Sequence, residues 1–368
     1  MISLRASLRG ITSFLLVCLA VLFVVTPSHA ATYEGNGFDT CQAPSLAAMG
    51  AWGASPYRAI GIYIGGVNRA CNQPNLNQSW VSSVGGEGWQ FIPTYVGLQA
   101  SGSSCKKCAV IDADKAAQEG KAAAIDAAAE MSVLGFSGGN PIYYDLESYP
   151  GTQTPTVLVF LSAWTSELHN LGYLSGVYAS ASSGITDLAN ASSTMVACSF
   201  CQGFSENFLE PDAVWIADWS DTTVSAILNP NASFIPAYDW QNNQRLEQYQ
   251  GNSKITYGGV TLSIDNDYLD GPVAEAGPQP PHLISYPTIV KGKWDLQATV
   301  GAWSGSQPMT YKYQWKRCKN GSCYLIYGAT KSSLKLIRKY SGYRLKIIVF
   351  ATNVAGYTYA YSALTPKV

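Results

Sequence analysis

Histidine is scarce in this chain of 368 residues, and its scarcity limits the chemistry that we expect. The sequence holds 3 histidines, of which His29 lies in an N-terminal segment described below. Neither His169 nor His282 has an acidic or nucleophilic neighbour in a recognisable motif. A Ser-His-Asp triad and a histidine-rich metal site are therefore disfavoured. We expect carboxylate chemistry, with no cofactor and no bound metal.

Long apolar runs are lacking beyond the N-terminus. Residues 1–30 combine basic Arg5 and Arg9, an apolar run over 11–25 and a small-x-small end at Ser28-His29-Ala30. This order is typical of a secretory signal peptide, with cleavage predicted after Ala30. The run is short for a membrane span, and no second run of that length follows. We expect a secreted, extracellular protein, associated with the cell wall and without a membrane span in the mature chain.

Export decides how the cysteines are interpreted. Of the nine cysteines, Cys18 lies in the signal segment, which leaves an even number in an oxidising compartment. We therefore predict disulfides, with Cys318 bridging locally to Cys323 and Cys41 a candidate partner of Cys71. The alternative is a zinc site built by four thiolates from two Cys-x-x-Cys pairs. It is disfavoured because nothing small and finger-like lies between those pairs, which are Cys105 with Cys108 and Cys198 with Cys201.

Acidic residues are nearly absent from the last quarter of the chain. Residues 281–368 hold ten lysines and three arginines against the single acid Asp295, a net charge of +12. Residues 31–280 hold eight basic and 23 acidic residues, a net charge of −15. Such a difference in charge between two parts of a chain indicates a charged partner. We expect residues 281–368 to bind anionic wall polymers electrostatically, and the alternative is that they form a passive spacer. The lysines lie without aromatic residues interleaved in one stripe, which argues against nucleic-acid recognition.

Eight predicted strands alternate with helical segments over about 240 residues. Helices are predicted over 45–52, 112–134 and 157–171, and 188–207 is not assigned. The strands are predicted over 36–40, 58–65, 89–96, 143–147, 174–179, 213–219, 245–250 and 260–267. Pro93 suggests an interruption in the third strand. The alternation predicts a parallel sheet, and eight repeats predict a TIM-like (β/α)8 barrel.

The pattern changes after the barrel. A Pro/Gly-rich linker is predicted over 272–281. Short alternating segments follow, separated by turn residues and without a helix-length run, which predicts a small all-β sandwich. The predicted organisation is a signal peptide at 1–30, a barrel at 31–271, this linker, and a basic sandwich at 282–368.

Two carboxylates follow each other on the fourth predicted strand. Residues two apart on a strand point the same way, so Asp145 and Glu147 lie on one face, about 6–7 Å apart along the strand. Like charges held so close are costly unless they serve a purpose, although a solvated strand end is the simpler interpretation. Barrel enzymes carry their catalytic groups at the carboxyl ends of the strands. Further residues at such ends predict a shared ligand pocket: Asp39, Tyr63, Tyr95, Tyr178, Trp215, Asp218, Trp219, Gln248 and Asp265.

These segments together resemble a known domain type. The matching segments are Phe38-Asp39, Tyr143 to Glu147, Trp215 to Trp219, Gln248-Tyr249 and Ile264-Asp265. Residues 34–271 resemble the glycoside-hydrolase-like domain of secreted bacterial proteins. That domain is similar to the family 25 muramidases, which cleave peptidoglycan glycan strands on a (β/α) barrel. The tail resembles bacterial Ig-like repeats through Gly301 to Gly305, Tyr313 to Cys318 and Ala351 to Gly356.

The resemblance implies roles for individual residues. Glu147 takes the general-acid position, and Asp145 orients or stabilises the 2-acetamido group of the substrate, which attacks the anomeric carbon. Asp39 and Asp265 match acids that line the muramidase pocket. The chain departs at Asp218, where the muramidase segment commonly has an aromatic residue, and this departure affects the expected substrate.

Three functions compete for the same barrel. The leading hypothesis is hydrolysis of peptidoglycan-like cell-wall polysaccharide by carboxylate acid catalysis, which needs one protonated carboxyl and one negative group. The second is a non-catalytic, envelope-associated module that binds glycan on the same scaffold. The third is a carboxylate metal site formed by Asp145, Glu147, Asp218 and Asp265.

Overall fold

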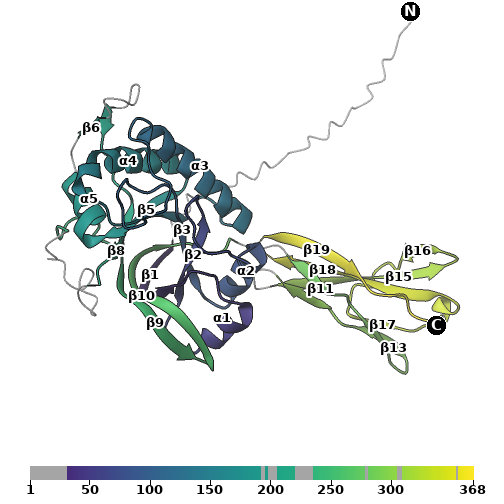
Figure 1. Ribbon diagram of the computed structural model, residues 1–368. Coiled ribbons are helices and arrows are strands. Elements are labelled where there is room, and N and C mark those ends of the chain that lie inside the picture. Colours follow the sequence, from purple (N-terminus) through teal and green to yellow (C-terminus); the bar gives the residue numbers. More distant parts are fainter. Residues whose placement is uncertain are drawn as a thin grey trace, which may run out of the picture.

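The structure is a computed structural model with a helix-flanked barrel and an all-β region, which lie end to end in Figure 1. It describes residues 31–191, 195–197, 205–219, 235–277, 281–304, 309–353 and 355–368. The predicted signal peptide, together with Cys198 and Cys201, lies outside these residues. Within the described ranges, no helix combines the length and apolar character needed to cross a membrane.

Eight strands close into a barrel, which confirms the predicted architecture. The strands are β1 (Ala31–Asp39), β2 (Ala59–Gly65), β3 (Gln90–Tyr95), β4 (Pro141–Leu146), β5 (Leu174–Ser180), β8 (Ala213–Ala217), β9 (Arg245–Tyr257) and β10 (Val260–Val273). They follow the order β1-β10-β9-β8-β5-β4-β3-β2 around the barrel. All neighbouring pairs are parallel except those of β10.

The direction of β10 differs from the fully parallel sheet that alternation suggests. β10 pairs antiparallel with both β9 and β1. The reason is a two-residue connection, Gly258-Gly259, with φ values of 53° and 79°. Two residues at positive φ make a tight hairpin, and a hairpin reverses the chain. The barrel is therefore mixed, and β10 brings its acids to the rim from the opposite direction.

Five helices flank the barrel in the described chain. They are α1 (Leu46–Trp52), α2 (Gln78–Gly86), α3 (Ala116–Leu134), α4 (Thr154–Asn170) and α5 (Thr186–Ala191). Ser45 caps α1, and α3 ends at Gly135 in the left-handed region. Asp112 does not cap α3. Its carboxylate accepts a hydrogen bond from the Asp114 amide, in the turn that precedes the helix.

Some local predictions for the barrel need correction. Pro93 lies inside β3 and does not interrupt it. Proline has no amide hydrogen to donate to a neighbouring strand. The β3–β4 ladder is accordingly short and pairs only Thr94 and Tyr95 with β4. In the unassigned stretch, the short strands β6 (Met195–Ala197) and β7 (Ser205–Asn207) pair with each other.

The barrel interior is filled by large rings, and glycine makes room for them. Its buried cluster comprises Ala59, Ile92, Tyr143, Ala213, Trp215, Leu246, Leu269 and Val273. The Tyr143 and Trp215 ring centroids lie 6.1 Å apart. A Cβ on Gly176 would lie 2.3 Å from Tyr143 Cδ1, and a Cβ on Gly61 would lie 2.5 Å from the Cβ of Asp39 at the end of β1. This filling leaves only the strand ends free to carry polar groups.

The C-terminal region is all-β. Its strands are β11 (His282–Ser285), β12 (Ile289–Lys291), β13 (Asp295–Ala298), β14 (Ala302–Ser304), β15 (Thr310–Lys319), β16 (Ser322–Leu325), β17 (Ser333–Lys335), β18 (Arg344–Asn353) and β19 (Gly356–Tyr361). They form sheets of order β12-β13-β17 and β16-β15-β18-β19 and the pair β11-β14. Trp315, Leu296 and Ile347 are fully buried in the core of this region.

The last strand of the barrel extends into the predicted linker. β10 continues to Val273, and Ala274 bridges Phe91, so the first residues of the predicted linker belong to the barrel.

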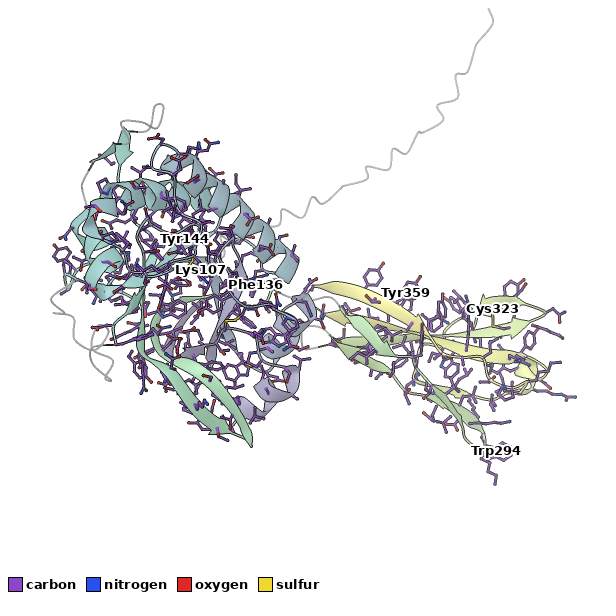
Figure 2. The ribbon with its side chains drawn as sticks, in the orientation of Figure 1. Lys107, Phe136, Tyr144, Trp294, Cys323 and Tyr359 are labelled. Carbon is purple, nitrogen blue, oxygen red and sulfur yellow. A yellow bond between two sulfur atoms is a disulfide. The ribbon has the colours of Figure 1, made fainter. Side chains whose placement is uncertain are left out.

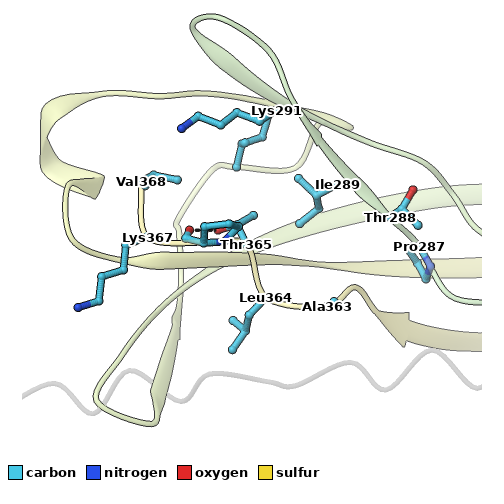
Figure 3. A pocket seen from close by; sticks show the side chains of 11 residues that line it. Pro287, Thr288, Ile289, Lys291, Ala363, Leu364, Thr365, Lys367 and Val368 are labelled. Atoms are coloured by element: carbon cyan, nitrogen blue, oxygen red, sulfur yellow. Dashed lines mark hydrogen bonds between the residues drawn. The ribbon is translucent and has the colours of Figure 1, made fainter.

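After β19 the chain runs beside the loop before β12 and leaves a groove of about 310 Å³ (Figure 3). The charged side chains that line this groove are Lys291 and Lys367.

Three disulfides lie in the described residues: Cys41–Cys71, Cys105–Cys108 and Cys318–Cys323. The disulfide prediction is confirmed for these pairs. With Cys105 and Cys108 bonded to each other, neither supplies a thiolate for the alternative zinc site. Several disulfides are typical of a protein outside the cytoplasm.

We predict that Gly176→Ala destabilises the barrel by about 1–3 kcal/mol, because the new methyl group meets the buried Tyr143 ring. The measurement is urea unfolding of the mature chain. Gly151→Ala is the matched control, since a Cβ there meets nothing within 4 Å. Equal stability of the two variants would show that Tyr143 can give way.

Candidate active site

The carboxyl end of β4 carries the two acids predicted from sequence. Asp145 shares the interior face of β4 with Tyr143, and Glu147 follows the strand directly. Asp145 is 8% exposed, whereas Glu147 is half-buried. Burial, and then the charges of Glu147 and Asp39, raise the pKa of Asp145 to about 8. One oxygen of this carboxyl, Oδ1, is buried without a hydrogen-bond partner.

Two residues that the sequence did not suggest hold this strand end in place. The fully buried Gln99 donates from Nε2 to the Asp145 carbonyl and accepts at Oε1 from the Glu147 amide, both at 2.8 Å. The Ser104 hydroxyl donates to Glu147 Oε2 at 2.7 Å. Both residues lie in the loop that contains the Cys105–Cys108 disulfide. No local pattern marks them, because their role depends on where that loop meets β4.

Asp39 at the end of β1 is the centre of a second hydrogen-bond group. Its Oδ1 accepts from the Tyr63 hydroxyl at 2.9 Å, and its Oδ2 accepts from Gln248 Nε2 at 2.6 Å. Gln248 Oε1 in turn accepts from the Tyr178 hydroxyl at 2.9 Å and from Trp219 Nε1 at 3.1 Å. Residues predicted from four separate strands, and from the segment after β8, are thus brought together.

Burial controls the protonation of Asp39. This residue is 2% exposed. Burial, and then the charge of Asp265, raise the pKa of Asp39 to about 7, although the hydrogen bonds from Tyr63 and Gln248 oppose the rise. Burial also raises the pKa of the half-buried Asp265, against the hydrogen bond from the Asn252 amide.

Asp267 is a further acid of this group that was not singled out from the sequence. It is fully buried, and its Oδ1 accepts from Trp215 Nε1 at 3.1 Å while its Oδ2 has no partner. Burial, and then the charge of Asp39, raise its pKa well above the usual range. The signal was available, since Asp267 lies two residues after Asp265 and so shares its face of β10.

Two predicted ligand-binding residues lie elsewhere. Tyr95 faces away from the barrel interior, and its hydroxyl donates to Asp126 Oδ2 of α3 at 2.7 Å. The reason is strand alternation: Ile92 points inward, so Tyr95, three residues later, points outward. Trp215 does point inward, but it is 1% exposed and lies edge-on beneath Tyr178.

The remaining predicted residues lie just beyond β8. The Asp218 amide donates to the Gln248 carbonyl at 3.1 Å, and its side chain is half-buried. Trp219 is 55% exposed, with its indole nitrogen directed to Gln248. Among the described residues, no three His, Cys, Asp or Glu side chains are grouped as a metal site would require. The arrangement supplies buried carboxyls with raised pKa values, the half-buried carboxyl of Glu147, and aromatic groups beside them.

We predict that Asp145→Asn stabilises the protein increasingly as pH rises. A carboxyl whose folded pKa is about 8 stays neutral in the folded chain, whereas the unfolded chain ionises near pH 4. The wild type therefore loses stability between about pH 4 and pH 8, and the asparagine variant does not. The expected gain is small at pH 4 and on the order of 2–5 kcal/mol at pH 8.

Urea unfolding at several pH values measures this difference. Asp114→Asn, at an exposed position before α3, is the control for removal of one carboxyl. A difference between Asp145→Asn and wild type that stays constant with pH would contradict the raised pKa.

Comparison with protein families assigns most of the barrel. Residues 50–269 match the family described as Rv2525c-like, glycoside hydrolase-like domain. This match runs from α1 into β10 and covers more than half of the chain. It includes the Asp145–Glu147 pair and leaves Asp39 outside. No curated protein matches the chain.

Several solved structures are similar to the chain at low identity. The Tat-secreted protein Rv2525c of Mycobacterium tuberculosis, in complex with L-tartrate, is 16% identical with a TM-score of 0.43, over 64% of this chain and 96% of that chain. An uncharacterized B. stearothermophilus protein is 14% identical with a TM-score of 0.41, over 64% and 95%. The modular autolysin LytC from Streptococcus pneumoniae, in complex with a synthetic peptidoglycan ligand, is 12% identical with a TM-score of 0.38, over 64% and 46%.

Proposed function

The chain belongs to the Rv2525c-like glycoside hydrolase-like family, and we propose that it hydrolyses glycosidic bonds of a peptidoglycan-like cell-wall polysaccharide. The observation that carries this proposal is the pair of carboxyls at the end of β4. Asp145 is buried with a pKa of about 8, and Glu147 beside it is half-exposed. Two adjacent carboxyls, one buried and one within reach of solvent, suit acid catalysis of glycoside cleavage, because the raised pKa of Asp145 keeps a proton at the pair that Glu147 presents to the substrate.

In the proposed reaction, Glu147 is the proton donor. It is the acid of the pair that solvent, and so a glycosidic oxygen, can reach. The Ser104 hydroxyl orients its carboxyl by holding Oε2. As the bond between the anomeric carbon and the leaving oxygen breaks, the proton passes from Glu147 to that oxygen.

Asp145 acts on the group that attacks the anomeric carbon in the same step. It orients the 2-acetamido group of the substrate, whose carbonyl oxygen attacks the anomeric carbon and forms a cyclic intermediate. Water then opens this intermediate, and Glu147, now ionised, takes the proton that the water loses. Gln99 keeps both acids in register by binding the backbone between them. Asp39, through Tyr63 and Gln248, completes the acidic rim.

Aromatic and polar groups around the acids would hold the sugar rings. Tyr63, Tyr178 and Trp219 are grouped through Asp39 and Gln248, and an aromatic ring offers sugars an apolar plane with a polar edge. Asp218 and Asp265 add half-buried carboxyls that can accept hydrogen bonds from hydroxyl groups. Trp215 acts beneath them by holding Asp267.

Non-catalytic glycan binding is the second candidate. The observation that favours it is that burial raises the pKa of Asp39, Asp145 and Asp267 together. Neutral carboxyls both donate and accept hydrogen bonds, so such a rim can bind sugar hydroxyls without turning them over. The two candidates differ only in whether bonds break.

We predict that Glu147→Gln lowers the rate of glycan cleavage by about 10²–10⁴-fold, because the amide has no proton to transfer. Binding of the glycan is retained. The assay is release of reducing ends from purified wall glycan, with co-sedimentation for binding. Glu34→Gln, an exposed position at the start of β1, is the matched control.

Each outcome of this assay decides between the candidates. Cleavage at the wild-type rate by Glu147→Gln would remove Glu147 as the acid. A wild-type protein that binds wall glycan but releases no reducing ends would establish the binding function instead.

We also predict that treatment with a metal chelator leaves cleavage unchanged, because the proposed steps use only carboxyl protons and the acetamido group of the substrate. The rate before and after dialysis against EDTA is the measurement. A loss of activity that a divalent cation restores would assign Asp145, Glu147, Asp218 and Asp265 to a metal site.

The proposed place of action is the cell wall. A secretory signal is predicted at residues 1–30, and three disulfides lie in the described chain. The excess of lysine and arginine in residues 281–368 would attract anionic wall polymers. The barrel would then act on glycan that the basic domain holds nearby.

A further inference from the structure

One side of the four-stranded C-terminal sheet faces solvent with cations and aromatic rings together. The opposite side packs on the core around Trp315. The solvent side is the cationic aromatic face, made of Lys312, Lys316, Arg344, Lys346, Phe350, Tyr357, Tyr359 and Tyr361. Cross-strand pairing places Lys316 opposite Lys346 and Phe350 opposite Tyr359. These residues come from three strands and lie far apart in the sequence.

In the part of the chain that the structure describes, the lysines of this face form no ion pair. Lys316 and Lys346 lie directly opposite each other, an arrangement that costs stability because like charges repel. Their Nζ atoms lie 5.8 and 4.4 Å from the centroid of the Tyr361 ring. The single acid of residues 281–368, Asp295, belongs to β13 in the other sheet. A bound anion would relieve this repulsion.

The aromatic rings of the face are open to solvent. Tyr357, Tyr359 and Tyr361 are 69%, 52% and 37% exposed. They alternate along the edge strand β19, so they form a row roughly 13 Å long. The Tyr359 ring lies 5.8 Å from those of both Phe350 and Tyr361, and it projects outward from β19 (Figure 2). Clustered exposed rings of this kind indicate a binding surface.

The face continues into a groove at the end of β15 and β16. This groove has a volume of about 310 Å³ and lies against the Cys318–Cys323 disulfide. Its lining residues include the cations Lys319, Arg344 and Lys367. Arg344 belongs to both the groove and the face, so the positive charge is continuous between them.

We propose that the cationic aromatic face and this groove bind an acidic polysaccharide. Sugar rings lie on the tyrosines, and the carboxylates of the polymer pair with the lysines and Arg344. Nucleic acid is the competing ligand, since it also uses aromatic and cationic surfaces. The choice of a glycan rests on the proposed function of the barrel, which is a glycoside hydrolase-like domain in the same chain.

The structure also corrects the expectation that aromatic residues are not interleaved with the lysines. Along the sequence, Lys316, Lys346 and Tyr361 are distant, so no single stripe is visible. Pairing of β15 with β18, and of β18 with β19, brings all three together.

The test measures binding of the full mature chain to a hyaluronan decasaccharide, an oligosaccharide with regularly spaced carboxylates. We expect the double variants Lys316→Gln/Lys346→Gln and Tyr357→Ala/Tyr359→Ala each to weaken binding about tenfold or more. Matched controls are Lys335→Gln in the other sheet and the fully exposed Tyr327→Ala, each expected within about twofold of wild type. Binding should also weaken as salt rises.

Comparison ligands separate the alternatives. Polyglutamate carries charge without sugar rings, and an oligothymidine carries charge with bases. Equal binding of polyglutamate and the decasaccharide, or a tyrosine variant that binds like wild type, would reduce the face to a charged patch and overturn the proposal. Tighter binding of oligothymidine than of the decasaccharide would assign the face to nucleic acid and overturn it as well.

The barrel proposal can be judged separately. We expect Glu147→Gln to bind the decasaccharide as the wild type does. If the protein cleaves wall glycan but does not bind the decasaccharide, the proposal for the cationic aromatic face is overturned and the proposed function of the barrel is retained. The reverse result would support the face and remove turnover from the barrel.

Discussion

The burial of several carboxyls at one end of a barrel is the constraint on which the rest of the site depends. A buried ionised carboxyl is costly, and several close together repel. Burial raises the pKa of Asp39 to about 7, that of Asp145 to about 8 and that of Asp267 as well, which favours their neutral forms. Hydrogen bonds from Tyr63, Gln248 and Trp215 satisfy oxygens of Asp39 and Asp267. These bonds fix the orientation of the acids. In the proposed function, the same features that lower the cost of burial would also prepare the groups for proton transfer.

The filling of the barrel determines where these acids can lie. Tyr143 and Trp215 occupy the interior, with Gly176 giving the Tyr143 ring room. Polar side chains are therefore confined to the strand ends above this layer. The hairpin at Gly258-Gly259 reverses β10, so that Asp265 lies opposite Asp39 in the register of the two strands. Mixed strand direction is thus part of how the acids meet.

The chain divides its charge between two parts with related proposed roles. The acidic barrel concentrates carboxyls that would transfer protons to a glycan, and the basic domain concentrates lysines that would hold an acidic glycan. A domain with a single acid cannot neutralise its own lysines internally. Its aromatic residues are accordingly stacked with cations on the surface, where they remain accessible. The two parts would act on one polymer at separate points.

The sequence by itself determined the eight strands, the use of the cysteines in disulfides with the local Cys318–Cys323 bridge, and the Asp145–Glu147 pair, because periodicity and short spacing are local properties. The sequence also sufficed to place Asp39 and Gln248 in the predicted pocket, because the carboxyl ends of barrel strands lie at one rim. Only the tertiary structure decided the direction of β10, the outward position of Tyr95, and the contacts of Gln99 and Ser104 with the strand end. The cationic aromatic face around Tyr361 was likewise decided only by the tertiary structure. Each of these depends on which segments become neighbours, and pairing between distant strands and loops leaves no periodic signal in the chain.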